Sequence, residues 1–190
     1  MEYQVKTAHG TLFCRREGSG PLLLLIHGVA CDSEFFREAS AILSKKFTVI
    51  SYDRRGYSRS IPAEGETDFS VWAHADDAAE IIGAELKRKH EEEICLEESE
   101  LQMNGAEEQS KVKDGQNTGF FVAGCSAGGA VAAALATKYP ELVRQVFLHE
   151  PLMRGSGELA AEQDAFWEKL HKSAEKHRII TCMMHFVNAM

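Results

Sequence analysis

Four apolar runs punctuate the chain, and helix-like segments separate them. The runs are LLLLIHG at 22–28, FTVISYD at 47–53, GFFVAG at 119–124 and RQVFLHE at 144–150. Continuous apolar runs of this length are typical of strands that are buried on both faces, as in a parallel sheet. Because strands that alternate with helices join through right-handed crossovers, the sequence predicts an α/β fold with a mostly parallel sheet flanked by helices.

Hairpin and helix signals fill the intervals between these runs. At the N-terminus, YQVKTA and TLFCRRE flank His9 and Gly10, which predicts a two-stranded hairpin. Asp32 and Ser33 can cap a helix over 33–44. The expected inner face of that helix consists of Phe35, Phe36, Ala39, Ile42 and Leu43.

Two more helices are expected further along the chain. A polar, glycine-containing loop at 54–67 precedes an apolar stripe at helical spacing, which predicts an amphipathic helix. The stripe consists of Val71, Ala75, Ala78, Ile82 and Leu86. A third helix is predicted over 127–138, where Tyr139 and Pro140 end it.

Residues 87–118 interrupt the alternation of strands and helices. They hold nine acidic and five basic residues, so this segment carries a net charge of −4, half of the −8 of the whole chain. A connection between a helix and a strand usually takes about two to six residues. We therefore predict a helix that continues past Leu86 into a flexible acidic insertion, with the docking of a partner as its alternative role.

Composition and charge exclude several classes of function. The net charge of −8 argues against a nucleic-acid binder, because phosphate binding needs a basic face. The longest apolar run, LLLLI, is too short to cross a bilayer, and the N-terminus shows no signal-peptide pattern. Five cysteines without a CxxC pair favour free thiols in a reducing compartment. We therefore expect a cytoplasmic protein without nucleic-acid or membrane partners.

No cofactor and no metal are expected. The histidines and acids lack ligand spacing of the HExxH or HxH kind. The chain also contains neither a phosphate-binding loop nor a dinucleotide-binding fingerprint.

The segment GCSAGG at 124–129 carries the strongest chemical signal. Its first five residues match G-x-S-x-G, a weak pattern alone, but here it lies directly between a predicted strand and a predicted helix. Such a turn holds the serine in a strained conformation at the carboxyl end of a parallel strand, where open α/β sheets bind ligands. N–H groups at the start of the helix suit a developing oxyanion. Ser126 is therefore the candidate nucleophile.

Three motifs follow one another along the chain: His27-Gly28 after a buried strand, DRRGYSRS at 53–60 after the next strand, and GCSAGG. In their order and spacing they resemble the α/β-hydrolase superfamily, in particular its esterase-like and peroxidase-like members. The resemblance covers residues 3–151 apart from the insertion, so it implies a partial α/β-hydrolase core at 1–151 and the start of a helical cap at 152–190. Two cap helices are expected, one over 159–174 and one beginning near Ile179.

The resemblance also implies roles for single residues. Ser126 would be the nucleophile, and the backbone N–H groups of Val29 and Ala127 would donate to the oxyanion. Asp53, Arg54 and Gly56 would shape the adjoining loop without taking part in catalysis. A serine at position 126 argues against an epoxide hydrolase or a dehalogenase, because those chemistries need a carboxylate nucleophile.

The other triad members are harder to find. In the family the acid and then the histidine follow the nucleophile, on later strands than the six predicted here. Glu150 ends the strand after the nucleophile and is the candidate acid; its alternative role is a hydrogen bond to the cap linker. None of the later histidines follows a late strand; these are His149, His171, His177 and His185. His27 is implied to be structural, so the fold is expected to be truncated after the sixth strand and to lack a visible base.

Three functions remain open from the sequence. The first is a serine hydrolase for a carboxylic ester or similar small acyl substrate, incomplete in this chain. The second is a non-catalytic binding or assembly module, or half of a split enzyme. Its partner would be a complementary C-terminal chain or a second copy, paired through the exposed apolar edge of the sixth strand. The third is an enzyme whose base is a cap histidine or comes from a second subunit.

Overall fold

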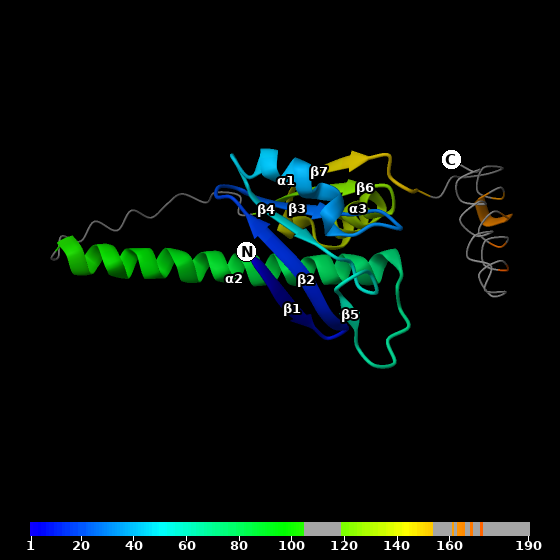
Figure 1. Ribbon diagram of the computed structural model, residues 1–190, viewed down its shortest axis with the longest axis horizontal. Coiled ribbons are helices and arrows are strands. Elements are labelled where there is room, and N and C mark those ends of the chain that lie inside the picture. Colours follow the sequence, from blue (N-terminus) through cyan, green and yellow to red (C-terminus); the bar gives the residue numbers. More distant parts are fainter. Residues whose placement is uncertain (105–118, 154–160, 162, 166–167, 169–171, 173–190) are drawn as a thin grey trace. The chain divides into compact units, whose positions relative to one another are not determined.

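The computed structural model describes residues 1–104, 119–153, 161, 163–165, 168 and 172, with the backbone alone for 96–104 (Figure 1). The chain divides into two compact units, Met1–Leu152 and Met153–Met190. The predicted cap helices lie largely outside the described residues. Within their region the structure describes residues 161, 163–165, 168 and 172, and these are helical. All the described strands belong to the first unit.

A seven-stranded mixed sheet forms the centre of the first unit (Figure 1). Its strands are β1 Glu2–Thr7, β2 Gly10–Glu17, β3 Leu22–Ile26, β4 Thr48–Tyr52, β5 Ile61–Pro62, β6 Phe120–Cys125 and β7 Val143–His149. The order is β1-β2-β4-β3-β6-β7, with β5 paired to β2. β4, β3, β6 and β7 run parallel, whereas β2 is antiparallel to both of its neighbours, β1 and β4. The predicted mostly parallel sheet and the N-terminal hairpin are therefore confirmed.

Side chains on the two faces of the sheet enter two separate apolar clusters. The helical elements are η1 Ser33–Phe36, α1 Arg37–Leu43, α2 Val71–Asn104, α3 Ala127–Lys138 and η2 Pro140–Leu142. The larger cluster joins α2 and α3 to one face, through residues such as Leu24, Ile50 and Val122. The smaller cluster lies on the opposite face, around Leu23, Leu25 and Val49. This alternation follows from the two-residue period of a strand.

The helix expected over 33–44 is divided in two, and its inner face is smaller than predicted. Asp32 caps the first part, as expected, by accepting a hydrogen bond from the Glu34 N–H at 2.9 Å. Phe36 and Leu43 pack on the smaller cluster, but Phe35, Ala39 and Ile42 are exposed. The reason is the 3-10 turn η1, which has three residues per turn and therefore shifts the direction of the apolar side chains.

An apolar hollow of about 260 Å³ lies on the same face of the sheet, where α1 leaves the strands uncovered. Its lining comes from Leu23, Leu25, Leu43, Phe47, Phe121, Ala123 and Phe147. β7 has β6 as its one neighbour among the described strands. Phe147 and Leu148 on β7 are 51% and 46% exposed. This side of the sheet therefore presents apolar side chains on a strand whose outer edge has no partner among the described strands.

Helix α2 confirms the predicted continuation past Leu86, because it extends to Asn104. Ala75, Ala78 and Ile82 of the predicted stripe are fully buried, whereas Val71 is exposed. The rest of the acidic segment, 105–118, lies outside the described residues. In the described part of the chain, no helix is long and apolar enough to cross a membrane.

Glu85 is an unexpected member of the buried face of α2. It is fully buried, and its carboxylate lies 3.2 Å from Arg16 Nε and 3.3 Å from Arg88 Nε. A buried charge is tolerated when it is paired. Arg16, on β2, is distant from Glu85 in the sequence, so the apolar pattern of α2 does not predict that this acid is buried.

Candidate active site

Ser126 occupies the turn between β6 and α3 in a conformation that residues with side chains rarely adopt. Its φ is 53° and its ψ is −122°. Strain of this kind costs on the order of 1–3 kcal/mol and persists only where the surroundings enforce it. Here the last residue of β7 and the segment that follows it supply that enforcement. The Ser126 N–H donates to the His149 carbonyl at 3.0 Å, and the Leu152 N–H donates to the Ser126 carbonyl at 2.9 Å.

The glycines of the GCSAGG segment allow three backbones to meet at this turn. A Cβ at Gly124 would overlap the carbonyl oxygen of Gly128, one turn further along the chain. A Cβ at Gly128 would overlap the Ile26 carbonyl oxygen and lie 2.5 Å from the His27 carbonyl oxygen. The start of α3 is therefore packed directly against the end of β3, which only a residue without a side chain permits.

Strained residues gather at one end of the sheet. The non-glycine residues with positive φ in the described part of the chain are Ala30, Ser58, Ser126 and Glu150. Each of them follows the carboxyl end of one of the parallel strands β3, β4, β6 and β7. Strain of this kind clusters at functional sites, and ligands of open α/β sheets bind at this end. This edge is the candidate active site.

The loop after β3 lies against the serine. A Cβ at Gly28 would lie 3.2 Å from Ser126 Cβ and 3.8 Å from its Oγ. Among the described residues, neither the Val29 N–H nor the Ala127 N–H donates to a protein acceptor. Both predicted oxyanion donors therefore belong to segments that adjoin Ser126. Their role toward a bound oxyanion stays a prediction.

His27 holds this loop and is not available as a base. It is fully buried, and burial, followed by the charge of Arg54, lowers its pKa to about 4. Its Nε2 accepts a hydrogen bond from the Arg54 N–H at 2.9 Å, so the proton lies on Nδ1. Nδ1 in turn donates to the Gly28 carbonyl at 2.8 Å. Both ring nitrogens are engaged, which agrees with the structural role implied for this residue.

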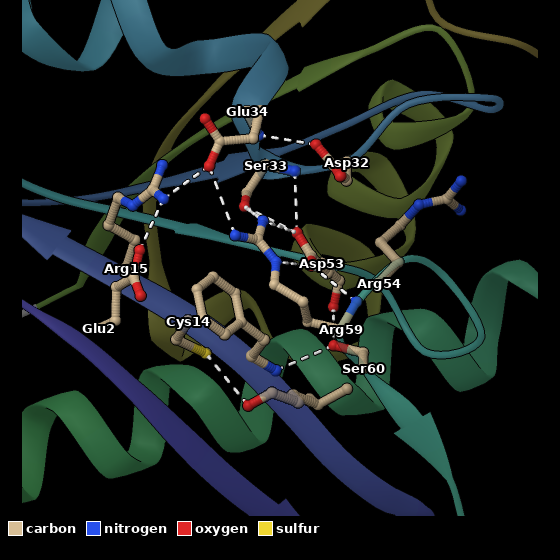
Figure 2. A network of polar contacts seen from close by, with 12 residues as sticks. Glu2, Cys14, Arg15, Asp32, Ser33, Glu34, Asp53, Arg54, Arg59 and Ser60 are labelled. Carbon is tan, nitrogen blue, oxygen red and sulfur yellow. Dashed lines mark hydrogen bonds and ion pairs between the residues drawn. The ribbon is translucent and has the colours of Figure 1, made fainter.

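Asp53, at the end of β4, organises the next loop through a buried network (Figure 2). One carboxylate oxygen accepts from the Ser33 N–H at 3.0 Å and the Ser33 hydroxyl at 2.7 Å. The other accepts from Arg59 Nε at 2.8 Å. Burial alone would raise the pKa of Asp53, but the hydrogen bonds from Arg59 and Ser33 lower it to about 2. Gly56 has a φ of 78°, and a Cβ there would lie 2.9 Å from the Phe69 ring.

Comparison with known proteins decides the family. Residues 21–90 match the family model described as the alpha/beta hydrolase fold. The chain is 31% identical over 160 residues to a Bacillus subtilis (strain 168) protein named uncharacterized hydrolase YraK, and the match covers 82% of this chain. The chain belongs to the α/β-hydrolase superfamily.

Other α/β hydrolases agree with this assignment. The chain is 32% identical over 136 residues to 2-(acetamidomethylene)succinate hydrolase of Mesorhizobium japonicum, which covers 72% of this chain. A crystal structure of E-2-(acetamidomethylene)succinate hydrolase matches with a TM-score of 0.55 and 29% identity, over 77% of this chain and 42% of that one. The chain spans 47% of the length of YraK and 37% of the Mesorhizobium protein, less than half of either curated relative.

Among the residues that the structure describes, no acid or histidine is brought together with Ser126 as a triad partner. Glu150 is exposed. Its charge is the second cause, after the burial of the thiol itself, that raises the pKa of Cys125. His149 Nδ1 lies 3.5 Å from Cys125 Sγ. Within the described part of the chain, no histidine or carboxylate is hydrogen-bonded to Ser126 Oγ; His171, His177 and His185 lie outside it. Glu150 as the triad acid stays a prediction.

Sequence reasoning missed Ser33 and Arg59, which complete the Asp53 network. Arg59 follows Asp53 by six residues within DRRGYSRS, and this spacing is the one local signal that could have identified it. Ser33 precedes Asp53 by 20 residues, with β4 between them in the sequence, and this separation leaves no local signal. As for a metal, the residues that the structure describes contain no group of three or more His, Cys, Asp or Glu side chains that could hold one.

Proposed function

We propose that this α/β-hydrolase superfamily member is a serine hydrolase, in which Ser126 attacks the carbonyl carbon of a carboxylic ester or similar small acyl substrate. The observation that carries this proposal is the strained Ser126 turn at the carboxyl end of β6, next to the loop of Val29. One relative is named 2-(acetamidomethylene)succinate hydrolase, and the substrate in that name carries an acetamido group. This name supports an acyl compound as the substrate class.

The reaction would follow acyl transfer through a covalent intermediate. A base accepts the Ser126 hydroxyl proton while Oγ bonds to the carbonyl carbon, and the N–H groups of Val29 and Ala127 stabilise the oxyanion. The leaving group takes the proton as the acyl-enzyme forms, and water then hydrolyses that ester. The base is expected from outside the described residues, because none of their histidines is hydrogen-bonded to Ser126 Oγ.

Labelling with a fluorophosphonate tests the nucleophile directly. We expect slow phosphonylation at Ser126, which Ser126→Ala abolishes. The control Ser44→Ala should leave it unchanged, because the Ser44 hydroxyl, just after α1, donates to the Ala41 carbonyl. Mass spectrometry of the labelled peptide gives the site. Added imidazole should accelerate labelling about 100-fold if a base is missing, the lower range of general-base catalysis.

Two outcomes would contradict parts of this proposal. An absence of labelling at Ser126, with imidazole present and the fold intact by circular dichroism, would rule out Ser126 as the nucleophile. Rapid labelling that imidazole does not accelerate would show that the chain already supplies its base.

The alternative function, an assembly module, is favoured by the outer edge of β7, which pairs with no other described strand. That edge carries the exposed Phe147 and Leu148 beside the apolar hollow. An exposed apolar strand edge is a template for pairing with another chain. The proposed partner for this function is a second copy, joined through β7.

The size of the protein in solution tests this pairing. We expect sedimentation equilibrium to show a dimer that Phe147→Lys weakens at least about tenfold, since a charge on an edge strand opposes pairing. Ile61→Lys is the control, because Ile61 is 67% exposed on β5, away from β7. A monomeric wild-type protein would exclude the second copy and leave a complementary chain as the partner.

A further inference from the structure

We infer that Arg54 and His27 polarise the peptide group between Gly28 and Val29 and thereby strengthen the Val29 N–H as a hydrogen-bond donor at the site. This inference rests on the proposed function, in which that N–H stabilises an oxyanion. It assigns Arg54 and His27 as positioning residues, since both act through the peptide group and not on the substrate.

The contacts converge on a single carbonyl oxygen. Arg54 Nη2 donates to the Gly28 carbonyl at 2.8 Å, and His27 Nδ1 donates to the same oxygen at 2.8 Å. That carbonyl shares its peptide group with the Val29 N–H. Arg54 is 3% exposed and His27 is fully buried, so water does not weaken either hydrogen bond.

Hydrogen bonds to a carbonyl draw electron density from the amide nitrogen toward the oxygen. The N–H of the same peptide group becomes a better donor, and such cooperativity strengthens a hydrogen bond by roughly 10–30%. A charged donor has a larger effect than a neutral one. The two donors here are a guanidinium and an imidazole that burial keeps neutral, so the polarisation does not depend on pH near neutrality.

Arg54 differs from the two other arginines of the DRRGYSRS segment in the use of its charge. Arg55 pairs with Asp77 at 2.9 Å and with Glu66 at 3.0 Å, and Arg59 pairs with Asp53 at 2.8 Å. Arg54 forms no ion pair with a carboxylate among the described residues. In Figure 2 its side chain points away from the Asp53 network.

Tyr57 completes the support of the guanidinium. The Arg54 Cζ lies 4.5 Å from the centre of the Tyr57 ring, and the His27 ring contacts the same tyrosine edge-on at 5.1 Å. A cation over an aromatic face keeps its charge while losing contact with water. The uncompensated charge of Arg54 is therefore directed at the Gly28 carbonyl.

NMR of the isotope-labelled chain tests the polarisation without any catalysis. In Arg54→Met we expect the Gly28 carbonyl ¹³C and the Val29 ¹⁵N resonances to move upfield relative to the wild type. Arg54→Lys, which retains a charge and a donor, should give an intermediate shift. Arg55→Met is the matched control: it removes an equally buried arginine from the same loop and should lower stability without moving the Gly28 carbonyl resonance.

The rate of fluorophosphonate labelling tests the effect of this polarisation on the reactivity of Ser126. Removing a whole oxyanion donor costs roughly 100- to 1000-fold, so weakening one should slow labelling of Ser126 by about tenfold in Arg54→Met. Unchanged Gly28 and Val29 resonances in Arg54→Met, or equal shifts in Arg55→Met, would overturn the inference. If Arg54→Met does not fold, the resonances of Arg54→Lys decide in the same way. Because the resonances can be recorded in Ser126→Ala, failure of the proposed nucleophile would leave this test intact.

Discussion

Replacing Gly128 by alanine is expected to destabilise the protein by about 4 kcal/mol or more, at the upper end of single substitutions. The new Cβ would overlap the Ile26 carbonyl oxygen and lie 2.5 Å from the His27 carbonyl oxygen. Neither carbonyl can move easily, because one ends β3 and the other begins the loop that Arg54 and His27 hold. Urea unfolding monitored by circular dichroism measures the loss.

Gly83→Ala provides a matched control for this prediction. Gly83 also lies within a helix, α2, but nothing lies within 4 Å of its missing side chain. Alanine there should stabilise the protein by about 0.5–1 kcal/mol through helix propensity and the entropy of the unfolded chain. If both variants change stability in the same direction, the close approach of α3 to β3 is not what requires glycine at position 128.

Asp53→Asn is expected to cost about 3 kcal/mol of folding free energy. The substitution leaves Arg59 without its carboxylate and converts acceptors of the Ser33 N–H and hydroxyl into a neutral amide. Removing one partner of a buried pair costs about 3–5 kcal/mol. We expect the lower value because Arg59 is 35% exposed. Asp32→Asn is the control, since asparagine caps a helix as well as aspartate.

The cost of Asp53→Asn should also depend on pH. The pKa of Asp53 is about 2 in the folded protein, below its ordinary value of 3.8. A lowered pKa stabilises the folded state above pH 3.8, and this contribution, about 2 kcal/mol, is lost as the pH falls through 2. Urea unfolding at a series of pH values should therefore show the wild type and Asp53→Asn converging in acid. A constant difference would mean that the charge of Asp53 contributes nothing.

Local constraints explain why the serine turn could be read from the sequence. The predicted helix at 127–138 matches α3, Ala127–Lys138, and the strand before it matches β6. Gly124 and Gly128 permit the close backbone approaches that this turn requires, and the continuous apolar run before them predicts a strand buried in a sheet. The pattern and its structural context therefore lie within about ten consecutive residues.

Buried charges could not be read in the same way. The loop at 54–67 is polar in sequence, yet Arg55 is fully buried because Asp77, 22 residues away, pairs with it at 2.9 Å. Glu85 is fully buried because Arg16 on β2 reaches it. A charged residue is expected to be exposed to solvent unless it has a partner of opposite charge. These partners are distant in the sequence, so the burial of Arg55 and Glu85 could not be predicted. The two-residue strand β5 within the same loop leaves no periodicity to detect.

The placement of the strained residues has a consequence for engineering the protein. Ala30, Ser58, Ser126 and Glu150 all hold positive φ values at one end of the sheet. Substitutions that relieve strain are among the simplest routes to heat resistance, and strained active sites are where such gains most often reduce activity. In this molecule the strained positions and the candidate active site lie at the same end of the sheet, after the carboxyl ends of β3, β4, β6 and β7. Selection for thermal stability and selection for reactivity would therefore compete for the same residues, while the opposite end of the sheet remains open to change.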